Sequence, residues 1–160
     1  DHRDLHSFPT RRSSDLCLEA YASGPALAAM GIKSVKQGRT TIIGDLVNYD
    51  LNSITPEVIA NAAQKGDQIA LDIFEYIGRM LGIAAANVSL VVGPEVIVIS
   101  GGVSLAGDLL LDPIRETIRS RIFVMPREVI QVRVGALGDQ AGILGSANWA
   151  SFKAKQSGCI

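Results

Sequence analysis

A run of apolar residues that ends in a glycine turn carries the clearest chemical signal of this sequence. The run Val96–Ile99 consists of four β-branched residues, which predicts a strand buried on both faces of a parallel sheet. Ser100, Gly101 and Gly102 follow, so the backbone can turn sharply and a ligand can lie close against it. Ser104 is placed to cap the next helix, whose free backbone N–H groups would point toward this turn. The arrangement is typical of nucleotide binding, although a tight strand-to-helix connection without any ligand fits the same residues equally well.

A pair of helices is predicted upstream of this strand. Thr55 and Pro56 suit the cap and the first position of a helix, and the apolar spacing predicts helices over 55–65 and 67–92, divided by Gly66. Three charged residues of the second helix fall opposite its apolar positions, and we interpret them as a solvated face rather than a catalytic group: Asp72, Glu75 and Arg79.

The remaining elements are predicted more coarsely. Residues 19–30 suggest a short helix interrupted at Gly24-Pro25, and residues 31–52 are expected to be rich in loops. Later in the chain we expect a helix that starts at Asp112-Pro113 and runs to about Ile122, a strand over 130–134, and a helix of small residues that ends near Lys155. Three arginines of the first of these helices could contact phosphate, and exposure with pairing to Glu116 explains them equally well: Arg115, Arg119 and Arg121. Three glycines near the last helix are typical of close packing: Gly138, Gly142 and Gly145.

The sequence around the glycine turn resembles the ROK family of sugar kinases, and within it the bacterial ATP-dependent glucokinases. The resemblance rests on PEVIVISGGVSLAGDLLLDPIRE and on ALGDQAGILGSA. The family usually has three glycines where this chain has Ser100-Gly101-Gly102, so one glycine is replaced by serine. In that family the turn packs against the adenosine part of ATP. The resemblance therefore implies that Gly101, Gly102 and Val103 bind ATP.

Cys17 opens a second stretch, CLEAYASGPA, that is similar to the same family. ROK proteins hold zinc with one upstream histidine and three cysteines in a CxCGxxGC array, and Cys17 matches the last of these cysteines. The resemblance implies a zinc ligand at Cys17 in the intact protein, whereas a lone cysteine without it is more often a small buried hydrophobic residue. Because a structural zinc ordinarily needs four ligands, we do not expect zinc in this chain alone.

Glu19 lies where ROK sugar kinases use a glutamate to bind sugar hydroxyls. A carboxylate suits this task because it offers several acceptor sites to neighbouring hydroxyls. From spacing alone, an acidic residue at a helix start is the better interpretation of Glu19, since the helix dipole favours it there. The resemblance to the zinc-organised loop shifts the prediction to sugar binding.

The first sixteen residues are expected to be an artefact. Residues 1–16 have no hydrophobic period, and His6 to Asp15 match the in-frame translation of a widely used sequencing adapter. The rival interpretation is a disordered or basic N-terminal arm. Three arginines and three aspartates lie in this stretch, so the net charge of −1 is the same without it.

The composition of residues 17–160 excludes several classes of function. Both histidines lie in the first sixteen residues, which leaves no imidazole for acid–base catalysis or metal binding. No basic excess suggests nucleic acid as a partner, no apolar run approaches the ~18 residues of a membrane span, and two cysteines at opposite ends give no disulfide framework. We expect a cytoplasmic, helix-rich α/β domain.

The resemblance implies an α/β fold with two or more short strands, part of the C-terminal lobe of an actin- or hexokinase-like (RNase H-like) ATPase. Residues 17–160 are expected to be a C-terminal piece of a longer gene product, called the parent protein below. The parent protein is expected to be a homodimer that uses ATP and Mg²⁺ to phosphorylate the 6-hydroxyl of glucose. In the family the catalytic aspartate and the phosphate loops precede the position of Cys17. No catalytic residue is therefore assigned, and the 160-residue chain is expected to be inactive.

Two other functions stay open. A ROK transcriptional repressor shares this lobe and adds a DNA-binding helix-turn-helix at its N-terminus. A sister kinase could phosphorylate fructose, N-acetylglucosamine or N-acetylmannosamine. The segment GVSLAGDLLLDPIRE favours the kinase, and the upstream sequence would decide between these functions.

The origin of residues 1–16 can be tested directly. Sequencing the locus by another library method should replace them with a CxCGxxG-like stretch and an upstream histidine. A genome that encodes DHRDLHSFPTRRSSDL in this place would contradict the adapter interpretation.

Overall fold

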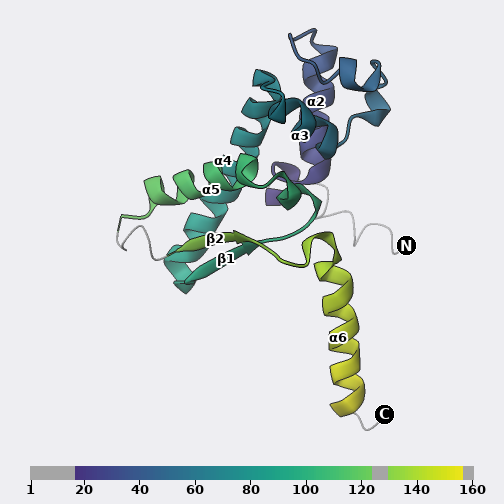
Figure 1. The fold of residues 1–160 in the computed structure, drawn as a ribbon. Coiled ribbons are helices and arrows are strands. Elements are labelled where there is room, and N and C mark those ends of the chain that lie inside the picture. The colour runs from purple at the N-terminus through teal and green to yellow at the C-terminus, as the bar shows by residue number, and fades with distance from the viewer. Residues whose placement is uncertain (1–16, 124–129, 157–160) are drawn as a thin grey trace, which may run out of the picture.

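A computed structural model describes residues 17–123 and 130–156 of the chain. Its helices and strands are α2 (Gly24–Lys36), α3 (Pro56–Gln64), α4 (Gln68–Val92), β1 (Val96–Ile99), α5 (Asp108–Arg121), β2 (Gln131–Val134) and α6 (Ala141–Gln156). Short 3-10 helices connect them: η2 (Leu18–Ala20), η3 (Asp45–Val47), η4 (Leu51–Ser53), η5 (Gly102–Ala106) and η6 (Gly138–Gln140). Helices α2 to α5 pack together beside a small sheet, and α6 projects away from them (Figure 1).

Side-chain caps set the starts of three helices. The hydroxyl of Ser23 accepts a hydrogen bond from the backbone N–H of Ala26 at 3.2 Å, so Gly24-Pro25 begins α2 rather than interrupting a helix. Thr55 and Asp67 cap α3 and α4 in the same way, which confirms the predicted helix pair. The prediction of loops over residues 31–52 is wrong for residues 31–36, because α2 continues to Lys36 and buries one face against the core.

Asp67 also ties the start of α4 to a distant loop. Its carboxylate accepts hydrogen bonds from the Thr41 hydroxyl at 3.0 Å and from the Ile42 backbone N–H at 2.7 Å. The predicted faces of α4 are confirmed, since Ile69, Ile73 and Ile77 are buried and the predicted solvated residues are exposed: Asp72, Glu75 and Arg79.

The two strands pair in parallel, with Val96 opposite Gln131 and Ile99 opposite Val134. The prediction that β1 is buried on both faces is wrong for this chain, because Val98 is 58% exposed. Ile97 and Ile99 pack against the core instead, on the other face of the strand. In the part of the chain that the structure describes, helices cover only that one face.

Helix α5 begins at Asp108, five residues before Pro113, which the sequence predicted as its first residue. Gly107 precedes it with φ +61°, and the helix runs from Asp108 through Pro113 without ending there. Ser104 does not cap α5, because its hydroxyl donates instead to the carbonyl of Gly101 at 2.7 Å. Pro113 lies inside α5, and its ring packs against α4 in the space that a side chain at Gly78 would fill.

Arg115 fastens α5 to the sheet. Its guanidinium donates to Asp108 at 3.0 Å, to Asp112 at 2.8 Å and to the carbonyl of Val132 at 3.2 Å. The expected pairing of this arginine with Glu116 is therefore wrong, because two carboxylates on the preceding turns of α5 are better placed.

Helices α4 and α5 approach each other at two glycines. A β-carbon at Gly82 would lie 2.5 Å from Cβ of Thr117 and 3.0 Å from the carbonyl oxygen of Ile114. A β-carbon at Gly78 would lie 3.0 Å from the carbonyl oxygen of Leu110. At both glycines the neighbouring atoms include a backbone carbonyl oxygen of α5, so neither position has room for a side chain.

Helix α6 makes no comparable contact. A β-carbon at Gly142 or Gly145 would meet no heavy atom within 4 Å, so the close packing predicted for them is absent within the described residues. Trp149 and Phe152 are more than half exposed and stack on each other, with ring centroids 5.7 Å apart. Among the described helices, none has the length and apolar character needed to cross a membrane.

A glycine-to-alanine substitution should change stability in opposite directions at the α4–α5 contact and in the open helix α6. Gly82→Ala should lower the free energy of unfolding by about 1–3 kcal/mol, because the added methyl group overpacks the contact with α5. Gly142→Ala is the matched control and should be neutral or stabilising by up to ~1 kcal/mol, because alanine is the better helix former and the site is open. Urea unfolding followed by circular dichroism measures both, and equal shifts for the two variants would contradict the packing described here.

Candidate nucleotide-binding cleft

The turn after β1 is shaped by one glycine and one serine. Gly101 has φ +100° and ψ 170°, a conformation open only to glycine. The buried Ser104 closes the turn, because its backbone N–H and its hydroxyl both donate to the carbonyl of Gly101. Gly102 has no such backbone constraint, and a β-carbon there would meet no heavy atom within 4 Å. The sharp turn predicted over Gly101 and Gly102 is thus present, with Gly101 as the residue whose backbone requires glycine.

A second loop, after β2, lies beside this turn. The backbone N–H of Gly135 donates to the carbonyl of Ile99 at 2.8 Å, and that of Gly101 donates to the carbonyl of Gly138 at 3.4 Å. A β-carbon at Gly135 would meet Oγ of Ser100, so this loop lies directly against the residue that follows β1. The carboxyl ends of both strands therefore form one continuous edge of the site.

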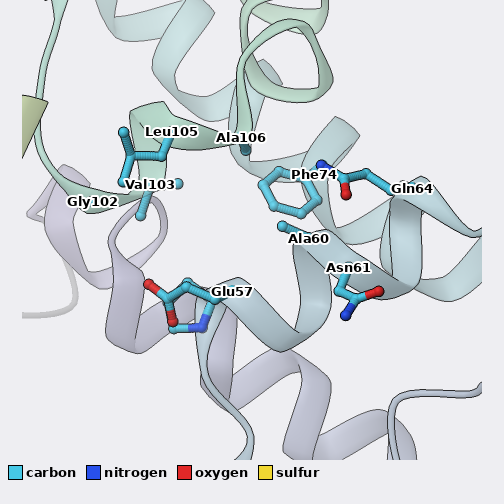
Figure 2. A pocket seen from close by; sticks show the side chains of 10 residues that line it. Glu57, Ala60, Asn61, Gln64, Phe74, Gly102, Val103, Leu105 and Ala106 are labelled. Atoms are coloured by element: carbon cyan, nitrogen blue, oxygen red, sulfur yellow. The ribbon is translucent and has the colours of Figure 1, made fainter. Parts of the chain in front are cut away.

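A cavity of about 300 Å³ opens between this turn and α3 (Figure 2). Apolar groups form most of its wall, and three polar side chains come from α3; the lining residues are Pro56, Glu57, Ala60, Asn61, Gln64, Phe74, Gly102, Val103, Leu105 and Ala106. Small-molecule sites are typically of this size or larger and combine apolar walls with a few polar groups. The cavity can therefore hold a flat, partly polar ligand such as a nucleoside.

The polar side chains lie on one face of α3. Glu57, Asn61 and Gln64 follow a spacing of four and three residues, which places them in one stripe along the helix. The opposite face buries Ile59, Ala62 and Ala63 in the core. Hydrogen bonding with the Thr55 hydroxyl, and next with the backbone, holds the pKa of Glu57 below its ordinary value, so this carboxyl is ionised at neutral pH.

The start of α2 borders the same region. A β-carbon at Gly24 would lie 3.5 Å from Cγ of Pro56 and 3.7 Å from Cγ2 of Val103, so α2 begins next to the turn and to α3. Glu19 lies in η2, one short connection before α2, and is exposed. The sequence-predicted sugar contact thus lies in the short segment before the helix start that borders the glycine turn.

The structure does not bring all predicted site residues together. Of the three residues predicted to bind ATP, Gly102 and Val103 line the cavity, and Gly101 shapes the turn behind them. Cys17 is exposed with a free thiol, and the described residues contain no group of three or more histidine, cysteine, aspartate or glutamate residues that could hold a metal ion. The zinc ligand that the resemblance implies at Cys17 concerns the intact protein and stays a prediction.

The wall of the cavity that α3 provides was not predicted from the sequence. Glu57, Asn61 and Gln64 lie about forty residues before the glycine turn and carry no motif of their own. Their helical spacing was the available signal, because it gives α3 a polar stripe opposite a face of buried apolar residues. Only the packing of η5 against α3 shows that this stripe faces a cavity.

Comparison with known proteins identifies the family. The sequence model described as "ROK family" matches residues 13–153. The chain belongs to the ROK family. This confirms the resemblance found at the glycine turn and at Cys17.

Curated ROK proteins of two kinds are similar to the chain. The glucokinase of Halalkalibacterium halodurans is 34% identical over 132 residues, which cover 81% of this chain and 39% of the relative. The xylose repressor of Caldicellulosiruptor bescii is 33% identical over 129 residues, which cover 81% of this chain and 32% of the relative. The chain thus spans less than half the length of the curated ROK proteins it matches.

A solved ROK structure has the same fold. The crystal structure of a ROK family glucokinase from Streptomyces griseus, in complex with glucose and AMPPNP, superposes with a TM-score of 0.72 at 31% identity. The match covers 83% of this chain and 44% of the glucokinase chain. The predicted fold class is confirmed: the chain is a helix-rich α/β part of the actin-like ATPase fold of ROK sugar kinases.

The turn predicts different outcomes for its two glycines. Gly101→Ala should lower the free energy of unfolding by about 1–3 kcal/mol, because its backbone conformation is strained for any residue with a β-carbon. Gly102→Ala should leave stability nearly unchanged, because its backbone is ordinary and its surroundings are open. Thermal unfolding of both variants tests this, and a Gly102→Ala variant as unstable as Gly101→Ala would contradict the geometry of the turn.

Proposed function

We propose that the parent protein is an ATP-dependent hexose kinase that phosphorylates glucose, and that residues 17–160 supply its adenosine site. The observation that carries this proposal is the cavity of about 300 Å³ that Gly102 and Val103 share with the polar face of α3. Its size, apolar walls and position at the carboxyl ends of parallel strands suit a nucleoside. The similarity to a glucokinase described in complex with glucose and AMPPNP supports the same ligands here.

In the proposed reaction, the residues of this chain bind the nucleotide and the hexose and orient them relative to each other. When bound, ATP supplies the phosphoryl group that is transferred, with Mg²⁺ on its phosphates. Gly102 leaves room for the nucleoside against the turn, and Val103 with Leu105 forms the apolar wall beside it. Glu19 accepts hydrogen bonds from sugar hydroxyls and so fixes the hexose near the start of α2. The general base that accepts the proton of the sugar hydroxyl comes from elsewhere in the parent protein.

Zinc has a structural role in this proposal and only in the parent protein. Cys17 is exposed and carries a free thiol, so it can serve as one of four ligands. The described residues contain no group of three or more histidine, cysteine, aspartate or glutamate residues that could hold the metal, and no step of the reaction uses it.

A ROK transcriptional repressor is the second candidate, and the similarity to the xylose repressor favours it. A coupled assay of the parent protein with glucose and ATP separates the two functions. ATP-dependent formation of glucose 6-phosphate supports the kinase. Absence of turnover with glucose, fructose, N-acetylglucosamine and N-acetylmannosamine, together with specific DNA binding, would overturn it.

Two substitutions should affect the two substrates of the parent kinase separately. Glu19→Gln weakens charge-assisted hydrogen bonds to the sugar, each worth ~1.5–3 kcal/mol, so the KM for glucose should rise about tenfold or more while that for ATP stays nearly constant. Gly102→Val fills the open side of the turn, so the KM for ATP should rise and that for glucose should stay nearly constant. Steady-state kinetics with each substrate varied in turn measures both effects.

The control for these kinetics is Glu75→Gln, which changes an exposed carboxylate on the solvated face of α4. It should leave both KM values unchanged. An unchanged glucose KM in Glu19→Gln would return Glu19 to the role of a helix-start acid. An unchanged ATP KM in a folded Gly102→Val variant would place the adenosine site elsewhere.

A further inference from the structure

The cavity is polar at both of its ends, and the two ends differ in chemistry. The Glu57 carboxylate lies at the end that adjoins Gly102 and Val103, whereas the Gln64 amide lies beside Phe74 at the other end (Figure 2). An ionised carboxylate only accepts hydrogen bonds, whereas an amide both donates and accepts. The two ends therefore suit different parts of one ligand.

The position of α2 fixes which way a nucleotide lies in the cavity. Gly24 packs against Pro56 and Val103, so the start of α2 adjoins the Glu57 end. Glu19, the proposed sugar contact, lies just before that helix. The phosphates must reach toward the sugar, and in a nucleotide the ribose joins the phosphates to the base. The ribose consequently lies at the Glu57 end and the base at the Phe74 end.

The residues at the Phe74 end of the cavity suit a nucleobase. Ala60, Phe74 and Ala106 give apolar surfaces against which an aromatic ring can pack, and the amides of Asn61 and Gln64 can pair with its polar edge. At the other end, the negative charge of Glu57 would repel a phosphate group but complements hydroxyl groups, which donate hydrogen bonds to it.

We infer that Glu57 binds the ribose hydroxyls of the nucleotide and so makes this cleft selective for ribonucleotides. This inference rests on the proposed adenosine site and adds the residue that selects the nucleotide's sugar. The vicinal hydroxyls of ribose present two donors, and a carboxylate presents two acceptor oxygens at matching spacing. The Glu57 side chain is exposed on the first turn of α3, and its carboxylate keeps acceptor sites besides those engaged by the Thr55 hydroxyl and the backbone.

The test compares ADP with 2′,3′-dideoxy-ADP, which lacks both hydroxyls. Calorimetric titrations of the parent protein are done with EDTA present, so that no divalent metal bridges the carboxylate and the phosphates. The unsubstituted protein should bind ADP about tenfold or more tightly than the dideoxy analogue. Glu57→Ala should weaken ADP binding to the level of the analogue and leave binding of the analogue nearly unchanged.

Two further variants make the comparison decisive. Glu75→Ala removes an exposed carboxylate from α4 and should leave both affinities unchanged. Glu57→Gln keeps the size of the side chain and should reduce the preference for ADP partly, which provides the readout if thermal unfolding shows Glu57→Ala to be misfolded. A preference for ADP that persists at full strength in folded Glu57 variants overturns this inference alone. A protein that binds neither nucleotide overturns the proposed adenosine site itself.

Discussion

The close approach of α4 and α5 at Gly78 and Gly82 sets the dimensions of the cleft. Phe74 lies one turn before Gly78 on α4, and α3 packs on the same helix, so α4 carries one wall of the cavity. Helix α5 follows directly after η5, which forms the opposite wall. Because backbone atoms of α5 lie within 3.0 Å of where the β-carbons of these glycines would be, any side chain there would push the two walls apart. The α4–α5 contact thus holds in place the helix that carries Phe74 and the segment η5, which line opposite sides of the cavity.

The turn after β1 divides its tasks among neighbouring residues. Gly101 takes the conformation that reverses the chain, and Ser104 stabilises it by donating to the Gly101 carbonyl. These two residues leave Gly102 with an ordinary backbone and an open side that faces the cavity. The backbone therefore requires glycine at Gly101, whereas Gly102 has open space beside it and lines the cavity.

Local signals made part of this structure predictable from the sequence. Thr55 with Pro56 marked the start of α3, and the β-branched run Val96–Ile99 marked β1, because both depend on neighbours in the chain. The start of α5 was predicted too late because Asp112-Pro113 looks like a helix start, whereas the chain begins the helix at the left-handed Gly107 and packs the proline ring against α4. The α3 wall of the cavity was not predictable, since Glu57 meets the turn only through tertiary packing.

The proposed function depends on where the nucleoside binds, and a crystal structure of the parent protein with ADP would locate it. The base should lie between Ala60 and Ala106 near Phe74, with the ribose hydroxyls within hydrogen-bonding distance of the Glu57 carboxylate and the open side of Gly102 against the nucleoside. An ADP molecule bound elsewhere, with the space between α3 and η5 closed or filled by other protein side chains, would contradict it.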